Sequence, residues 1–386
     1  MFRSIFSVFA FLLFFTFLLI VSCGDTNESS NLTKRTGPYY GEEPPGLIPK
    51  MFAPDLVGPE HHKHSAPAFS PDGTEMFFSV YFNNEQPQNI VYTKQVDGIW
   101  TVPEVAFFSG VYQDGGPVFS PDGNRLYFYS KRPFDPGGEK LEESNIWYIE
   151  KENSLWRNPK PLKGTVNRYD GSSSLHSFTP SGDALIGRHK QSPDYDIYLS
   201  EIDGKDWSEP INIGPPINDP DAIEGNALII PDEQTLIFFR YDPNNRPLAG
   251  LYMSDKNKDG SWAEPRRMGD MFCNGESRFS MLSPDKKYLF FTSYRSGPEE
   301  IYWVDASIVD MLKKYDLNLV SQLTEIIENE GIGAALIKYE TYIAKHSKYY
   351  LFDGSLLDQT GNMLIGKNLI KDADRKSTRL NSSHRL

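Results

Sequence analysis

Cysteine is almost absent from this sequence, since only Cys23 and Cys273 occur among 386 residues. A small fold stapled by several disulfides is therefore excluded. Positive charge is also scarce, because 39 lysines and arginines face 52 aspartates and glutamates and the net charge is −13. A nucleic-acid partner, which needs a basic surface, is not expected. The Gly-x-Ser-x-Gly elbow of serine hydrolases does not occur either, so a fused hydrolase of that type is not predicted.

A long apolar run occurs at the N-terminus, where Arg3 is followed by residues 5–21 without a charge. The run is long enough for either an export signal or a membrane-spanning helix. It ends in Ile20-Val21-Ser22-Cys23, which resembles the lipobox of bacterial lipoproteins. The resemblance implies that residues 1–22 are a signal peptide and that Cys23 becomes lipid-modified. An uncleaved anchor and a plainly secreted protein are the alternatives.

The resemblance to lipoproteins also predicts where the protein acts. A lipid on Cys23 would hold the chain to a membrane of the bacterial cell envelope, and we expect the protein to face the periplasm. Residues 23–49 are rich in polar residues, Gly and Pro and poor in large apolar residues. Such a composition cannot bury enough surface to fold, so this segment is predicted to be a flexible tether.

One short phrase, an apolar segment followed by Ser-Pro-Asp-Gly or a variant of it, recurs along the chain. Its prolines are Pro71, Pro121, Pro180, Pro231 and Pro284, at spacings of 50, 59, 51 and 53 residues. Pro presets the backbone of a turn, and Gly accepts the positive φ that the turn needs. Aromatic-rich segments follow each turn and predict strands. This period is typical of the blades of a β-propeller.

The segments between the turns predict four strands per blade. In four units the last segment reads Trp-x-x-Pro, and Pro favours an edge strand because it cannot donate a hydrogen bond. The fifth unit has no such segment, but residues 52–57 resemble it and would close the ring. We therefore predict an all-β fold over residues 50–306, a propeller of five four-stranded blades. Six blades would require an irregular blade that the repeat does not reveal.

The repeated phrases resemble the PD40, or WD40-like, repeats of TolB-type propellers. The two best copies run from Phe69 to Gly73 and from Phe119 to Gly123; the third lacks the Asp, and the fourth and fifth lack the Gly. The resemblance implies a propeller that binds other proteins, although a fold alone does not fix a function.

The period of the pattern changes after the propeller. Apolar residues recur at three- and four-residue spacing over 307–374, which predicts helices. Residues 357–373 resemble the start of a tetratricopeptide repeat, a unit that needs neighbours to bury its apolar face. Residues 375–386 show no periodicity and resemble a translated sequencing adaptor. We interpret them as a non-native tail and expect the natural chain to continue as a helical repeat.

Ionisable residues precede the repeated turns, where the innermost strand of each blade is expected to begin. Candidates for a ligand-binding ring at the channel mouth are His64, Asp114, Asp170, Glu224 and Glu276. The alternative is that the carboxylates pair with arginines of neighbouring blades. Arginines that end the second strands could be those partners: Arg132, Arg188, Arg240 and Arg295.

Two groups of residues are candidate metal ligands, and neither predicts a metal strongly enough to assign a cofactor. Histidines two residues apart point to the same side of a strand, so His62 and His64 could share a metal. The related pectin-oligomer lyases also hold a metal through histidines, but their histidines come from several blades. Asp255, Asn257 and Asp259 alternate as in half of a calcium loop, but the twelfth position is not Glu. A solvated loop and a hairpin turn are the alternatives, and calcium or another divalent cation stays open.

These observations favour a non-catalytic lipoprotein that uses its propeller as a scaffold for an envelope protein partner. The competing hypothesis is an envelope enzyme or sensor that acts on a glycan-derived oligomer at the channel mouth. A metal held by channel-mouth residues would favour the second hypothesis.

Overall fold

The computed structural model describes residues 34–346, with gaps at 58–61, 64, 82–86, 168–169, 192–193, 204–205, 245, 247–248, 274–275 and 315–318. Cys23 and the signal peptide, His64, the tetratricopeptide-like residues 357–373 and the tail at 375–386 lie outside the described residues. The chain divides into Met1–Lys34 and Arg35–Leu386, and the description below concerns the second unit.

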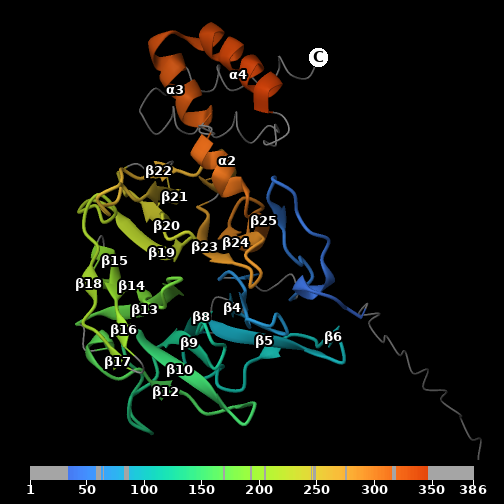
Figure 1. Ribbon diagram of the computed structural model, residues 1–386, viewed down its shortest axis with the longest axis vertical. Helices are drawn as coiled ribbons and strands as arrows, with labels where there is room; N and C mark the ends of the chain where they lie inside the picture. The colour runs from blue at the N-terminus through green and yellow to red at the C-terminus, as the bar shows by residue number, and fades with distance from the viewer. Residues whose placement is uncertain are drawn as a thin grey trace, which may run out of the picture. The chain divides into compact units, whose positions relative to one another are not determined.

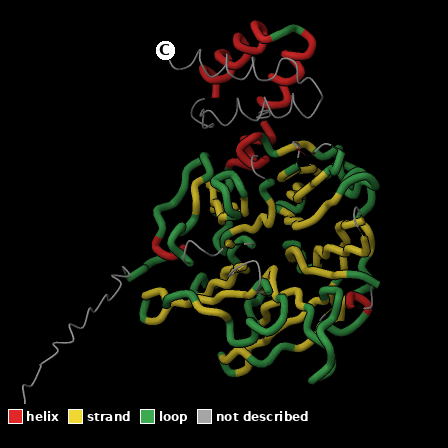
Figure 2. The backbone as a smooth tube through the Cα atoms, turned by 180° about the vertical axis from the view of Figure 1, so that it is seen from behind, coloured by secondary structure: helices red, strands yellow, loops and turns green. Residues whose placement is uncertain are grey.

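Antiparallel meanders follow one another along the chain and are arranged around a common centre (Figures 1 and 2). The first contains β2 (His62–Lys63), β3 (Ala68–Phe69), β4 (Glu75–Tyr81), β5 (Asn89–Val96), β6 (Ile99–Trp100) and β7 (Glu104–Val105). The next contains β8 (Asp114–Phe119), β9 (Arg125–Ser130), β10 (Asn145–Glu152), β11 (Leu155–Trp156) and β12 (Lys160–Pro161).

The remaining meanders repeat this pattern. The third contains β13 (Ser172–Phe178), β14 (Ala184–Gln191), β15 (Asp194–Ser200), β16 (Ile202–Asp203), β17 (Asp206–Trp207) and β18 (Ile211–Asn212). The fourth contains β19 (Ile223–Ile229), β20 (Thr235–Tyr241), β21 (Gly250–Asp255) and β22 (Arg266–Arg267). The last contains β23 (Arg278–Leu282), β24 (Tyr288–Ser293), β25 (Glu300–Asp305) and, from the other end of the chain, β1 (Lys50–Met51).

The repeated turns join the first and second strands of the meanders. In the first turn the Ser70 hydroxyl donates to Asp72 Oδ1 at 2.6 Å, and Gly73 has a φ of +71°. Ser120 and Asp122 make the same contact in the second meander. Where Gly is missing, Glu233 and Lys286 adopt the positive φ instead. The turn therefore forms without Gly, although a residue with a side chain pays a conformational free energy for this φ.

The segments that read Trp-x-x-Pro do form the outer edges, as predicted, but each is split by its proline. In the first meander β6 and β7 pair with different parts of β5, on either side of Pro103. The split in the second meander lies between β11 and β12, around Pro159. Because Pro donates no hydrogen bond, the ladder is interrupted at that residue.

The N-terminal segment completes the last meander two residues earlier than the sequence predicts. Lys50 and Met51 pair with Trp303 and Tyr302, and the Phe52 amide donates to the Ile301 carbonyl at 2.8 Å. Beyond Phe52 the chain turns away at Ala53, which has a φ of +40°. Fully buried Phe52 packs against rings of the first and last meanders and so joins the two ends of the series.

The described part of the predicted tether is docked rather than free. We call residues 35–46 the strap. Tyr39, in the short helix η1 (Tyr39–Gly41), packs edge-on against Phe69 and Tyr288 at 5.6 and 5.2 Å between ring centroids. The Gly37 carbonyl accepts a hydrogen bond from Trp100 Nε1 at 2.8 Å. Two adjacent tyrosines supply the apolar surface that the surrounding polar residues lack, which explains the difference.

The first strands of successive meanders contact one another in chain order, β8 to β13 to β19 to β23, so they line the centre of the series. The apolar core lies between meanders. One cluster joins Phe77 and Ile90 of the first meander to Phe128 and Trp147 of the second. Lys63, only 1% exposed, pairs with Glu300 at 2.5 Å across the seam between the first and last meanders.

The helices predicted after the propeller are present. They are α2 (Ile308–Lys314), α3 (Leu319–Asn329) and α4 (Ile332–His346). Their apolar faces share one cluster with the last two meanders, through Leu312, Leu323 and Tyr339. Within residues 34–346, no described helix has the length and apolarity needed to cross a membrane.

Candidate functional site

The carboxylates that begin the first strands are closed off by arginines. Asp114 Oδ1 lies 2.8 Å from Arg132 Nη2, and Glu224 Oε1 lies 2.7 Å from Arg240 Nε. Both acidic side chains are fully buried. Each arginine follows or ends the second strand of the same meander, so the partner does not come from a neighbouring meander as expected. The geometry is that of the pairing alternative rather than of an open ligand ring.

An arginine also lies at the corresponding place in the two meanders that carry Ser instead of an acidic residue at the start of the first strand. Arg188 donates to the Thr165 carbonyl at 3.1 Å, and Arg295 donates to Ser277 Oγ at 3.2 Å and to the Met271 carbonyl. The arginines of the acidic meanders also reach such carbonyls, in the loop that leads into the first strand. These arginine clamps therefore fix the loops at one end of the meanders.

Burial dominates the titration of the clamped acids. Burial raises the pKa of Glu224 to about 7, although the Arg240 guanidinium opposes this shift. Burial likewise raises the pKa of Asp114, against the opposing effect of Arg132. The removal of a carboxylate from water costs more here than one ion pair returns, which is the usual balance for buried pairs.

The other predicted site residues are not brought together. Asp170 and Glu276 are exposed. His64 lies outside the described residues, as does the side chain of His62. Asp255 pairs with Arg266 at 3.2 Å. Asn257 and Asp259 bond to Ser261 within a hairpin turn. Among the described residues, no group of three or more His, Cys, Asp or Glu side chains is placed to hold a metal ion.

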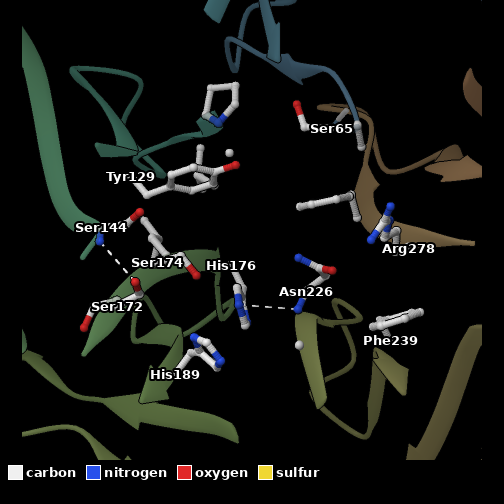
Figure 3. Close-up of a pocket in the computed structure, with 18 of the residues that line it drawn as sticks. Ser65, Tyr129, Ser144, Ser172, Ser174, His176, His189, Asn226, Phe239 and Arg278 are labelled. Atoms are coloured by element: carbon white, nitrogen blue, oxygen red, sulfur yellow. Dashed lines mark hydrogen bonds between the residues drawn. The ribbon is translucent and has the colours of Figure 1, made fainter. Parts of the chain in front are cut away.

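A cavity of about 420 Å³ lies where the first strands converge, and we call it the channel pocket (Figure 3). Every meander contributes to its lining. The polar lining residues include Ser65, Tyr81, Gln113, Tyr129, Lys131, Ser144, Ser172, Ser174, His176, His189, Tyr195, Asn226, Arg278 and Ser280. Apolar lining residues include Val118, Leu175, Ile223, Phe239, Phe279 and Met281.

A hydrogen-bonded group lies at the centre of this pocket. Ser174 Oγ and Tyr195 Oη are 2.9 Å apart, and Tyr195 Oη lies 3.4 Å from His176 Nε2. The same Nε2 accepts a hydrogen bond from the backbone N–H of Asn226 at 3.4 Å (Figure 3). An accepting Nε2 puts the proton of the neutral ring on Nδ1. That Nδ1 is buried and has no hydrogen-bond partner among the described residues.

Burial lowers the pKa of His176 to about 3. The residue is only 8% exposed, and none of the carboxylates that the structure describes opposes this shift by favouring the charged form. His176 is therefore neutral over the physiological pH range. In this state it can donate through Nδ1 but is a weak general base, because useful bases have a pKa near the working pH.

Glycines make room for the rings of the channel pocket. A Cβ at Gly115 would lie 2.4 Å from Tyr129 Oη, and a Cβ at Gly187 would lie 2.3 Å from His176 Nε2. A Cβ at Gly225 would lie 2.8 Å from a ring carbon of Tyr195. The first and second strands thus use Gly where an aromatic side chain lies flat against the backbone.

The channel pocket itself was not predicted from the sequence. Its signal is the polar run Ser172-Ser173-Ser174, followed by His176, along β13, and all four of these residues line the pocket. The prediction instead followed the acids at the strand starts, which are clamped by arginines. Sequence alone does not show which face of a first strand turns toward the centre.

The meanders, the pocket and the terminal helices define a mainly β protein of the propeller type. No protein-family model matches the chain, and no curated protein sequence is similar to it. Among solved structures, a protein assigned as TolB from Agrobacterium tumefaciens has a TM-score of 0.41 at 18% identity, over 65% of this chain and 79% of that one. An oligogalacturonate lyase from Vibrio parahaemolyticus has a TM-score of 0.35 at 17% identity, over 64% and 67%. A glycoside hydrolase has a TM-score of 0.42 at 12% identity, over 71% and 92%. These similarities are too weak to indicate an activity.

Proposed function

We propose that this chain is a non-catalytic bacterial lipoprotein of the cell envelope, anchored through Cys23 and facing the periplasm. Its strands would form a five-bladed propeller closed by β1, and the propeller would serve as a binding scaffold for an envelope protein. Residues 357–373 would extend the helical segment as a repeat unit. The observation that carries the scaffold role is a set of exposed apolar side chains on the loops that precede β8 and follow β9.

We call Phe107, Val111 and Phe134 the apolar rim. Their exposed fractions are 61%, 76% and 45%. The two loops that carry them meet at Arg132, which donates to the Phe108 carbonyl at 2.9 Å and lies over the ring of Trp147. Phe134 stacks on the same Trp147 ring. Neighbouring exposed apolar side chains on anchored loops are typical of a protein-binding surface.

The lining of the channel pocket supports a binding role over acid–base catalysis. Among the described lining residues there is no Asp or Glu, and of the two histidines there, His176 and His189, His176 stays neutral and buried. Hydrolases and lyases that act on glycans need a group that can give or take a proton at the working pH.

The many hydroxyl groups of the pocket favour the alternative function, an enzyme or sensor for a glycan-derived oligomer. Release of shortened or unsaturated oligomers by the purified protein would support that alternative.

Replacement of Cys23 by Ser is expected to abolish lipid attachment. Cells that express the wild-type chain and are fed an alkyne fatty acid should yield a labelled protein in the membrane fraction, because only the cysteine can be acylated in this way. The C23S variant should carry no label. Replacement of the buried Cys273 by Ser is the matched control and should leave labelling intact. Equal labelling of C23S and the wild type would contradict the proposed anchor.

A photo-crosslinking residue at Val111 is expected to capture a discrete protein partner in cells. The same residue at Ile211, which is 69% exposed on β18, is the control and should not give that adduct. Introduction of Asp at Phe107 should reduce the adduct from position 111 several-fold, because a charge must be desolvated in an apolar contact. Identical adducts from positions 111 and 211 would contradict a binding role for the apolar rim.

A further inference from the structure

The lining of the channel pocket contains no acidic residue in the part of the chain that the structure describes. The net charge is −13, yet none of the described lining residues is Asp or Glu. Asp114 and Glu224, which begin two first strands, are held in arginine clamps. Glu299 is bound by the lining residue Arg278 at 3.0 Å and by the Thr292 hydroxyl at 2.6 Å. These described acids are therefore taken up by other contacts and do not line the pocket.

Two positively charged side chains line the pocket. Arg278 lies on the wall opposite Tyr129 (Figure 3) and is paired with Glu299 at 3.0 Å. Lys131 also lines the pocket, and among the described residues its ammonium group forms no ion pair. The Nδ1 of His176 has no partner among the described residues, but it is itself buried and is not open to the pocket. Lys131 is therefore the charged donor that is left for a ligand.

Aromatic side chains form much of the remaining wall. Tyr129, Tyr195 and Phe239 line the pocket, and two of these rings lie against glycines that leave them no room to move back. Rings held in this way present flat surfaces to a ligand with an apolar or ring-shaped body. The volume of about 420 Å³ suits a small molecule rather than a polymer.

From these features we propose that the channel pocket binds a small organic anion with an apolar or ring-shaped body, its negative group placed toward Lys131. This inference rests on the proposed binding role and adds a second ligand to it. The anion would pair with the Lys131 ammonium group, and its body would lie between the aromatic walls. A neutral molecule of the same shape would leave that ammonium group without a partner of opposite charge.

The test compares two fluorescent probes on the purified chain. 1-Anilinonaphthalene-8-sulfonate carries a negative group, and N-phenyl-1-naphthylamine has the same ring body without it. We expect the sulfonate to bind saturably at one site and more tightly than the amine. Lys131→Glu should weaken sulfonate binding about tenfold by like-charge repulsion and leave amine binding within about twofold. Lys140→Glu, an exposed change of equal charge on the same loop, should leave both unchanged.

Several outcomes would overturn the inference. Equal affinities for the two probes would show that the negative group is not recognised. An equal effect of Lys131→Glu and Lys140→Glu would show only a general effect of net charge. Loss of sulfonate binding on Val111→Asp, with Lys131→Glu neutral, would place the probe on the apolar rim. In each case capture of a partner from position 111 would still decide the scaffold role separately.

Discussion

Replacement of Arg240 by Met is expected to destabilise the protein by about 3–5 kcal/mol. Arg240 holds the fully buried Glu224 and also donates to the Ile217 carbonyl at 2.7 Å. Without the guanidinium, Glu224 must either stay charged in an apolar site or take up a proton, and both choices cost free energy. Urea unfolding at pH 8, where free carboxylates are ionised, measures the loss as a lower free energy of unfolding.

Two further variants make this prediction specific. Glu224→Gln in the Arg240→Met background should restore a large part of the lost stability, because the buried charge is then gone. Arg266→Met breaks the half-exposed pair with Asp255 and should cost less than about 1 kcal/mol. If Arg240→Met and Arg266→Met cost the same, the clamp is not a stabilising contact and the loop fixation argued above fails.

Replacement of His176 by Gln is expected to remove much of the acid sensitivity of the fold. The pKa of His176 is about 3 in the folded protein, below its ordinary value of 6.5. Between these values the unfolded chain binds a proton that the folded chain does not, so stability falls as the pH falls from 6.5 to 3. This one group accounts for a loss of up to about 5 kcal/mol. Above pH 6.5 it contributes no slope.

The measurement is the free energy of unfolding of the wild type and of His176→Gln at several pH values from 3 to 8. Gln keeps an acceptor near the Asn226 amide, so the strand contact is retained. The difference between the two proteins should be constant above pH 6.5 and should change in favour of the variant below it. Ser177→Ala, a buried neutral change on the same strand, should shift stability equally at every pH. Parallel curves for wild type and His176→Gln would contradict a buried neutral ring.

The architecture could largely be predicted because its signals are local. Each turn repeats a short phrase in which Pro, Asp and Gly or its substitute fix the backbone, and each Trp-x-x-Pro marks an edge. The helical period after the propeller was equally clear. Closure by the N-terminal segment was predicted, but its position was wrong by two residues. The strand pairing ends at the buried Phe52. The sequence does not show whether an apolar residue at this position pairs within the strand or packs between the first and last meanders.

The determinants of the candidate site are not local. From the sequence, Asp114 and Glu224 could bind a ligand or pair with arginines such as Arg132 and Arg240. Only the three-dimensional structure shows that they pair, and that each pair forms within one meander. To predict that polar residues of β13 line a pocket, one must know which side of the strand faces the centre. The docking of Tyr39 depends on rings more than 200 residues away along the chain, Tyr288 among them.

The docked strap sets how far the propeller could stand from a membrane. A free tether from Cys23 to residue 49 would reach roughly 90 Å when fully extended, whereas the stretch from Cys23 to Arg35 reaches only about 40 Å. Tyr39 is held beside Phe69 and Tyr288, next to the repeated turns, while the apolar rim lies on loops at the other end of the first strands. If Cys23 carries the proposed lipid, the docked strap would therefore shorten the reach of the tether by about half.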